Sequence, residues 1–305
     1  MRMFSVPSDH SSLELTFEFF PPKSEKARVG MLDAAARLKQ LIPGFCSVTY
    51  GACGSNQAGT LDSALAIADA AECAPAAHLT CVGASRQEID AVALKFRDAG
   101  IRRIVALRGD PQGNAGYYQG HLEGYQNAAD LVAGLSRLGD FDISVAAYPE
   151  KHPESLSVEA DIDNLKAKLD AGANRAITQF FFDPEAYLSF RDRAAARGVW
   201  KTIVPGILPI RNIDQVVRFA ERCGASVPAA TVEAFGRATS AADRKNIAID
   251  QAANMCDRLI RHGVRDFHFY TLNKADLCLD ICKALNLSAQ ADTAIAQAAA
   301  ATAHN

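Results

Sequence analysis

The chain has 305 residues, of which 49% are hydrophobic and 22% charged, a composition typical of a globular protein with one large core or two domains. Its net charge of -3 and its pI near 6.2 create no basic field, which argues against nucleic acid or an anionic membrane as a partner. No apolar run approaches the roughly 18 residues of a membrane span and no secretion signal is present, so a cytoplasmic protein is expected.

The first predicted element is a buried strand that ends at the double proline Pro21-Pro22, because proline continues neither a ladder nor a helix. This strand carries one carboxylate, Glu18, near its carboxyl end and among aromatic neighbours. An apolar wall disfavours the ionised form, so the pKa of Glu18 is expected to rise toward the range of a proton donor. The alternative is a core glutamate that the backbone or an arginine satisfies.

Seven further strands and the helices between them follow in chain order. Ser24 is expected to cap the first helix, Thr60 the second and Ser85 the third, the last through a capping box. Asp183, followed by a proline, starts a later helix in the same way. The expected strands are 45–50, 76–81, 102–107, 143–147, 176–180, 202–205 and 267–270. The expected later helices cover 125–138, 161–171, 214–222, 228–261 and 274–285.

Eight strands, each followed by a helix and none joined by a hairpin turn, predict an α/β fold: a parallel sheet closed into a (β/α)8 TIM barrel. The expected organisation is one catalytic domain over 1–287, with extra helices before the last strand, and an alanine-rich tail over 288–305. An open doubly wound sheet is the alternative. It is less favoured because neither G-x-G-x-x-G nor a P-loop pattern occurs.

A barrel carries its active site at the carboxyl ends of its strands, where polar residues gather in this sequence. The segment 108–124 is longer than an ordinary connection and is therefore expected to be a functional loop. The strand ends together provide two acids and few cations, which suits a large, partly aromatic ligand. The polar residues in question are Glu18, Thr49, Tyr50, His78, Thr80, Arg108, Asp110, Tyr148, His152, Gln179, Tyr270 and Asn273.

Neither the cysteines nor the histidines form a recognisable metal motif. The eight cysteines are scattered, no C-x-x-C occurs, and no two histidines have helical ligand spacing. Most cysteines are therefore expected to be buried thiols. Cys278 and Cys282 lie four residues apart on an expected helix and are interpreted as structural. No metal site is predicted.

Seven motifs, taken together and in order, resemble methylenetetrahydrofolate reductase over about 15–285 of this chain. The resemblance is to the catalytic barrel of the bacterial type, without the regulatory domain of the animal and fungal enzymes. The motifs are FEFFPP at 17–22, SVTYG at 47–51, HLTC at 78–81, LRGD at 107–110, AYPE at 147–150, TQFFFD at 178–183 and FHFYTLN at 267–273.

The resemblance implies a flavoprotein of one-carbon metabolism and methionine supply. Such an enzyme transfers hydride from NADH or NADPH to FAD and then reduces 5,10-methylenetetrahydrofolate to 5-methyltetrahydrofolate, in a ping-pong sequence. The sequence does not distinguish NADH from NADPH, because no ribose-recognition loop of the Rossmann type is present. The sequence is compatible with a homo-oligomer.

The resemblance also assigns roles to individual positions. Glu18 is implied as the general acid for opening of the folate ring, and Asp110 as the carboxylate between flavin and pterin that stabilises a cationic iminium. FAD is implied to be held by Thr49, His78, Arg108, Gly109, Asp110, Tyr148, His152, Asp161, Asn164 and Lys168. Folate or nicotinamide is implied to contact Glu18, Gln179, Phe219, Tyr270 and Lys274. Ala167 and Lys274 stand where the family often has arginine, which affects expected contacts to FAD and to the folate tail.

Two other functions remain open at this point: a cofactor-free lyase or aldolase barrel, and a non-catalytic barrel that binds folate or acts as a scaffold. Individual residues also have structural interpretations. Asp110 can pair with Arg108, Lys168 can share a solvated helix face with Lys166, and Phe219 can be a core residue of an amphipathic helix.

Overall fold

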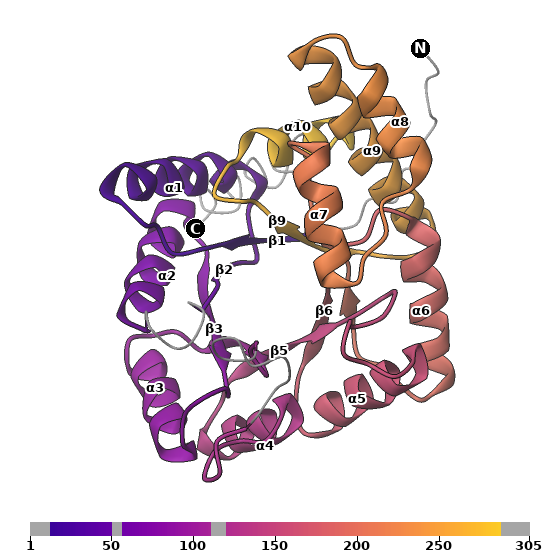
Figure 1. The fold of residues 1–305 in the computed structure, drawn as a ribbon. Coiled ribbons are helices and arrows are strands. Elements are labelled where there is room, and N and C mark those ends of the chain that lie inside the picture. Colours follow the sequence, from indigo (N-terminus) through magenta and orange to yellow (C-terminus); the bar gives the residue numbers. More distant parts are fainter. Residues whose placement is uncertain (1–12, 51–56, 111–119, 288–305) are drawn as a thin grey trace, which may run out of the picture.

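The computed structural model describes residues 13–50, 57–110 and 120–287, and these form a (β/α)8 barrel, as predicted. A ring of strands lies inside a ring of helices (Figure 1). The nine strands pair in parallel in the order β7-β6-β5-β4-β3-β2-β1-β9-β8. They are β1 Glu14–Phe19, β2 Phe45–Val48, β3 Ala74–Thr80, β4 Arg103–Leu107, β5 Asp142–Ala147, β6 Arg175–Thr178, β7 Ile203–Val204, β8 Gly206–Ile207 and β9 Asp266–Tyr270.

The seventh barrel strand is divided by a proline, which differs from the single strand expected at 202–205. Pro205 has no N–H to give to a ladder, so β7 pairs with β6 and β8 pairs with β9 on either side of it. The carbonyl of Pro205 still accepts a hydrogen bond from the His268 N–H, at 3.0 Å. The two ends of the sheet are thus consecutive in the chain, and this closes the barrel.

Most helix starts follow the predicted caps. Ser24 accepts from the N–H of Ala27, and Ser85 forms a capping box with Glu88. Asp183 caps the helix that begins with a proline, also as predicted. The helices are α1 Glu25–Leu38, α2 Gln57–Ala71, α3 Arg86–Asp98, α4 Ala128–Leu138, α5 Val158–Asp170, α6 Pro184–Ala196, α7 Ile213–Cys223, α8 Ala229–Arg237, α9 Ala241–Arg261 and α10 Asp276–Ala284.

Two predicted helix starts are wrong. Thr60 is not a cap, because α2 already begins at Gln57, and its hydroxyl instead donates to the carbonyl of Thr49 at 3.2 Å. Helix α4 begins after its N-cap Asn127 rather than at Tyr125. The start of α4 is set locally, because the Asn127 side chain accepts from the N–H of Asp130 at 3.0 Å.

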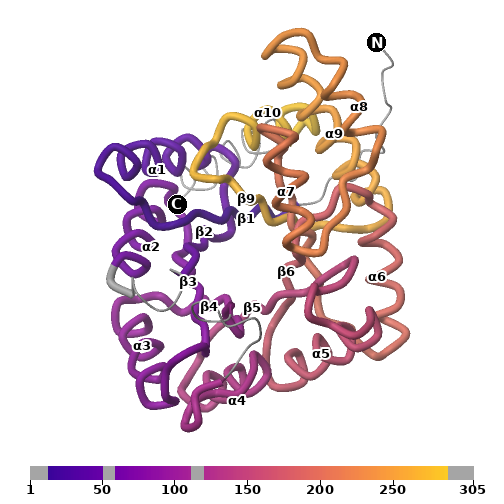
Figure 2. Tube along the Cα trace, viewed as in Figure 1, coloured from indigo at the N-terminus to yellow at the C-terminus, as the bar shows by residue number. Residues whose placement is uncertain are grey.

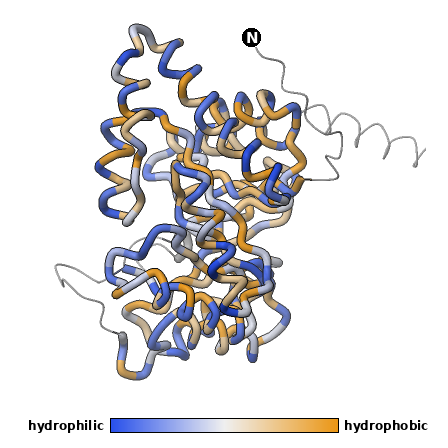
Figure 3. The backbone as a smooth tube through the Cα atoms, turned by 90° about the vertical axis from the view of Figure 1, so that its right-hand side faces the viewer, coloured by the Kyte–Doolittle hydropathy of each residue, from blue (hydrophilic) through white to orange (hydrophobic). Residues whose placement is uncertain are grey.

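Two hydrophobic layers fix the barrel. The larger lies between the outer face of the sheet and the helices, along which hydrophobic and hydrophilic stretches alternate (Figure 3). The smaller fills the inside of the barrel with Phe45, Ala76, Val105, Ile177 and Val204. Because alternate residues of a strand point to opposite faces, the positions on the same inner face nearer the carboxyl ends are free to carry polar groups.

Helices α8 and α9 stand beside α10 and α7 at one side of the barrel, as the tube in Figure 2 shows. They are the extra helices expected before the last strand. Within the ranges that the structure describes, no helix has the length and apolar character needed to cross a membrane. The tail predicted at 288–305 and the segment 111–119 of the predicted functional loop lie outside the described residues.

Candidate active site

A cavity of about 660 Å³ opens among the carboxyl ends of the strands. The residues to which the resemblance assigned roles all line it, with the exception of Lys274. Asn273, one of the polar strand-end residues, does not line it either, because its side chain bonds to the backbone of Phe20. Lys274 lies just beyond β9, where its side chain is exposed and its N–H donates to the carbonyl of Thr271 at 3.1 Å. Parallel strands bring the other residues together, because their carboxyl ends meet at one rim.

Glu18 lies at the centre of a cluster with two histidines. Strand register places it between Ser47 of β2 and Tyr270 of β9. Its Oε2 atom lies 3.2 Å from Nε2 of His78 and 3.5 Å from Nε2 of His268. The carboxylate is 18% exposed and His268 is fully buried, so water screens this cluster poorly.

The expected rise in the pKa of Glu18 is wrong. Burial does raise it, but attraction by His78 and hydrogen bonding to His268 and His78 outweigh burial and lower the pKa to about 2. The sequence stretch around Glu18 showed only its apolar neighbours, whereas both histidines come from other strands. The ligand-free pocket therefore favours an ionised Glu18.

His268 was not assigned a role from the sequence, although its position carried a signal. Residues 266, 268 and 270 share one face of β9, as Thr16 and Glu18 share one face of β1. Tyr270 was already expected at the site, so the period of two also directs His268 into the barrel. The alternation of inward and outward side chains along β1 and β9 would therefore have identified His268 as a site residue.

The hydrogen bonds of Thr16 indicate where His268 carries its proton. The Thr16 hydroxyl donates to the carbonyl of Phe267 at 3.2 Å and lies 2.7 Å from Nδ1 of His268. We assign the tautomer in which the hydroxyl gives its one hydrogen to the carbonyl and Nδ1–H of His268 donates to the Thr16 oxygen. A neutral His268 then presents a bare Nε2 to Glu18, and an attractive contact there requires one further proton on the pair.

One wall of the cavity is aromatic. Phe219 of α7 is 46% exposed and stacks on Phe180 with ring centroids 5.2 Å apart, so it is not a residue of the packed core. The Tyr270 hydroxyl donates to the carbonyl of Thr178 at 2.7 Å, and burial raises the Tyr270 pKa. The Oε1 of Gln179 accepts from the N–H of Phe180 at 3.0 Å, which fixes the amide at the rim.

The cavity wall also holds a buried cation. Lys168 of α5 is only 5% exposed, and its Nζ donates to the carbonyl of Ala146 at 2.5 Å. Burial, opposed by the charge of Asp161, lowers the Lys168 pKa to about 8. The interpretation of Lys168 as part of a solvated face is therefore wrong, whereas Lys166 does lie on the surface and pairs with Asp170 at 2.6 Å.

His152 is fixed beside this cation. The backbone N–H of His152 donates to Oδ2 of Asp161 at 2.8 Å, and the ring Nδ1 accepts from the backbone N–H of Glu154 at 3.1 Å. The neutral ring therefore carries its hydrogen on Nε2, as a donor. Burial and the charge of Arg108 lower the His152 pKa. The ring also meets Tyr148 edge-on, with centroids 4.6 Å apart.

The segment after β4 brings backbone close to the cavity. Arg108 forms an ion pair with Glu154 at 2.7 Å. Gly109 has a φ of +89°, and a Cβ atom there would lie 2.5 Å from Cγ1 of Val82, so only glycine fits. Asp110 follows at the rim with an exposed side chain.

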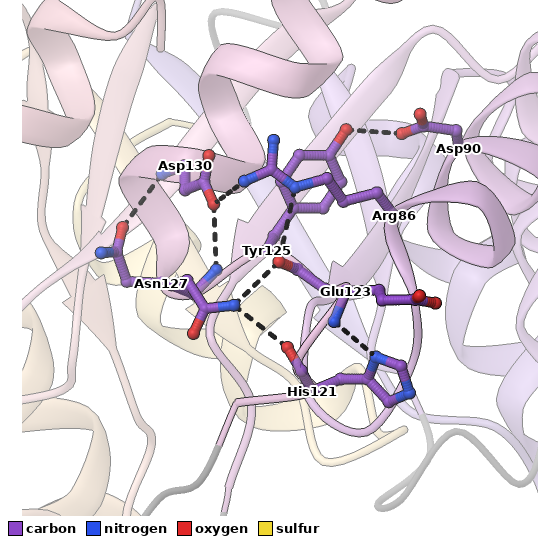
Figure 4. Close-up of polar contacts among 9 residues, drawn as sticks. Arg86, Asp90, His121, Glu123, Tyr125, Asn127 and Asp130 are labelled. Atoms are coloured by element: carbon purple, nitrogen blue, oxygen red, sulfur yellow. Dashed lines mark hydrogen bonds and ion pairs between the residues drawn. The ribbon is translucent and has the colours of Figure 1, made fainter.

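A polar cluster of Arg86, Asp90, Tyr125 and Asp130, here called the polar latch, connects the start of α4 to α3 (Figure 4). Arg86 forms an ion pair with Asp130 at 2.8 Å and lies over the ring of Tyr125, 4.9 Å from its centroid. The Tyr125 hydroxyl donates to Asp90 at 2.6 Å. Asn127, which caps α4, lines the cavity, so the latch positions this part of the wall.

The fold and the site define the class: a (β/α)8 barrel with a cavity at the carboxyl ends of its strands, where an acid contacts two buried histidines and a buried cation lines the wall. The family model of methylenetetrahydrofolate reductase matches residues 5–286. The chain belongs to this family.

Similar proteins span nearly the same length. The 5,10-methylenetetrahydrofolate reductase of Escherichia coli is 45% identical over 93% of this chain and 94% of its own length. That of Pectobacterium carotovorum is 47% identical over 90% and 91%. An uncharacterized protein from Clostridium thermocellum, solved with two copies of 5-methyl-5,6,7,8-tetrahydrofolic acid, shares the fold with a TM-score of 0.59. It is 13% identical, and the match covers 91% of this chain and 95% of that chain.

Proposed function

We propose that this protein reduces 5,10-methylenetetrahydrofolate to 5-methyltetrahydrofolate, using FAD and NADH or NADPH, with folate and nicotinamide occupying one cavity in turn. Membership of the reductase family supports the folate reaction. The observation that carries the proposal is the contact of Glu18, which lines the cavity, with two buried histidines, because ring opening needs a proton delivered away from bulk water.

The cavity suits a large dinucleotide. Its volume of about 660 Å³ lies within the range of roughly 300 to 1,000 Å³ that is usual for ligand sites. Lys168 and the Nε2–H of His152 are the donors that would hold the diphosphate, and Gly109 lets the backbone approach a ligand closely. Bound FAD supplies hydride chemistry, accepting hydride from reduced nicotinamide and donating it to folate.

The acid in this proposal is the Glu18–His268 pair rather than Glu18 alone. A carboxyl with a pKa of about 2 holds almost no proton at neutral pH, so a neighbouring group must pass one to it, and Nε2 of His268 lies 3.5 Å away. One proton shared between Oε2 and Nε2 can pass through Glu18 to the amine that leaves when the folate ring opens. His78 keeps the carboxylate oriented by its contact at 3.2 Å.

The other side chains position the two hydride partners. Asp110 at the rim supplies negative charge to the cationic iminium that ring opening produces. Phe219 presents an exposed ring for stacking, an interaction worth about 0.5 to 1.5 kcal/mol beyond burial. Gln179 lines the same cavity and offers its amide to either partner.

Two measurements on the purified protein test the proposal: its visible absorption spectrum, and its oxidation of NADH or NADPH with 5,10-methylenetetrahydrofolate as acceptor. A flavin spectrum with folate-dependent oxidation is expected. A colourless protein that converts an aldol substrate would indicate the cofactor-free barrel instead. Folate binding without oxidation of reduced nicotinamide would indicate a binding protein.

Lys168→Met is expected to weaken FAD binding by roughly ten- to hundredfold, because a hydrogen bond to a charged group is worth about 1.5 to 3 kcal/mol. The dissociation constant is measured by flavin fluorescence on adding FAD to the apoprotein. Lys166→Met is the matched control, since it removes the same charge from the same helix on the surface. Equal affinities in the two variants would exclude the diphosphate role.

A further inference from the structure

Helix α7 carries Phe219 to the cavity, but few of its own side chains are packed. Val216 and Ala220 are the buried residues of this helix, all of which the structure describes. Phe219 is exposed beside Ala220, and its ring stacks on that of Phe180. A helix that buries little apolar surface is not held rigidly by its packing alone. The place of the Phe219 ring therefore depends on what fastens the two ends of α7.

The start of α7 is fastened by an ion pair. Arg211 lies just before the helix, and its guanidinium donates to Asp276 of α10 at 3.0 Å. Asn212 caps the helix by accepting from the N–H of Gln215, also at 3.0 Å. Since the inner face of α10 is buried in the core, this end of α7 has a fixed partner.

The other end of α7 is fastened by the carboxylate of Glu150. Both carboxylate oxygens lie 3.0 Å from the backbone nitrogen of Ser226, just past the helix, and the Ser226 hydroxyl donates to the same carboxylate. A carboxylate acceptor makes such hydrogen bonds stronger than a neutral one does. Glu150 belongs to the AYPE motif at 147–150, but the resemblance assigned it no role. The structure shows that it joins α7 to the loop after β5.

The backbone approaches closely at the same junction. Gly224, the C-cap of α7, has a φ of +72°, and a Cβ atom there would collide with the carbonyl oxygen of Lys151. The loop after β5 is held independently of α7, because the backbone N–H of His152 donates to Asp161 at 2.8 Å. The loop is therefore the fixed side of the junction, and the end of α7 is the part that Glu150 holds in place.

We propose that Glu150 is a positioning residue for the aromatic wall of the cavity: by holding Ser226 it keeps the Phe219 ring where folate or nicotinamide can stack. The inference rests on the proposed function, in which both hydride partners use this ring. Without the carboxylate, the end of α7 is expected to occupy other positions in the free protein, so binding must first restore the productive one. The affinity for both partners should fall, whereas the turnover of the saturated enzyme should not.

The test is a double-mutant cycle on the full chain with FAD bound. Calorimetry gives the dissociation constant of 5-methyltetrahydrofolate, and kinetics with a quinone acceptor give KM and kcat for NADH or NADPH. Glu150→Ala is expected to raise the dissociation constant and KM by roughly three- to tenfold, which corresponds to a productive fraction of about 10 to 30%, with kcat nearly unchanged. In a Phe219→Ala background the same substitution should have no further effect, because no ring is left to position.

Two further variants complete the test. Glu221→Ala removes an exposed carboxylate from the same helix and should leave both constants unchanged. Ser226→Ala deletes only the hydroxyl donor, so a smaller rise is expected, and this variant tests the contact even if Glu150→Ala does not fold. Equal rises in the wild-type and Phe219→Ala backgrounds, or weaker FAD binding in Glu150→Ala, would overturn the positioning role alone. A wild-type protein without flavin or folate binding would overturn the proposed function, and this inference with it.

Discussion

Replacing Glu18 by glutamine should slow folate reduction by about 100- to 10,000-fold while leaving the oxidation of reduced nicotinamide nearly unchanged. Glutamine keeps the volume of the side chain and its place between His78 and His268, but its amide cannot transfer a proton to the departing amine. The loss corresponds to roughly 3 to 5 kcal/mol of transition-state stabilisation. Stopped-flow measurement of each half-reaction separates the two effects.

A quinone acceptor provides the control for this variant, because it removes electrons from the reduced enzyme without any protonation of folate. Equal losses with the quinone and with folate would show that Glu18 is structural.

The acid stability of the fold gives an independent check. Since the folded pKa of about 2 lies below the ordinary 4.5, ionised Glu18 stabilises the wild-type fold above pH 4.5. That contribution is lost as the pH falls toward 2, and the glutamine variant should lack this dependence.

The fold could be predicted because its signals are local. Ser24, Ser85 and Asp183 announce helix starts through caps, and apolar runs of strand length recur between the helices. The seventh strand was harder, because only the closed barrel shows that the chain pairs on both sides of Pro205. Thr60 likewise looked like a cap until the carbonyl of Thr49 was found to be its partner.

The candidate site shows the same division between local and distant information. The resemblance to the reductase family implied that Glu18, Lys168 and Phe219 belong to one site, and the barrel places all three around one cavity. The direction of the Glu18 pKa was wrong because His78 and His268 approach from strands far along the chain. The pKa of a group inside the barrel depends on its distances to charged and hydrogen-bonding groups on other strands, and the sequence around one strand does not contain those distances.

The shared proton of the Glu18–His268 pair leads to a second large effect, on the pH dependence of folate reduction. Since the pair must hold a proton to act, kcat/KM should fall as the pH rises. His268→Gln should remove this alkaline limb and lower folate reduction by roughly ten- to hundredfold, with nicotinamide oxidation retained.

Thr16 allows the same mechanism to be tested without removing the histidine. In Thr16→Val the Nδ1–H of His268 loses its acceptor, so the neutral ring can move its hydrogen to Nε2 and donate to the Glu18 carboxylate. An extra proton then stabilises the Glu18–His268 pair less, so the fall of kcat/KM at alkaline pH should begin at a lower pH. Thr16→Ser keeps the hydroxyl and should restore the wild-type profile. Identical profiles in the valine and serine variants would mean that the hydroxyl does not govern the proton of the pair, and an unchanged limb in His268→Gln would assign the acid to Glu18 alone.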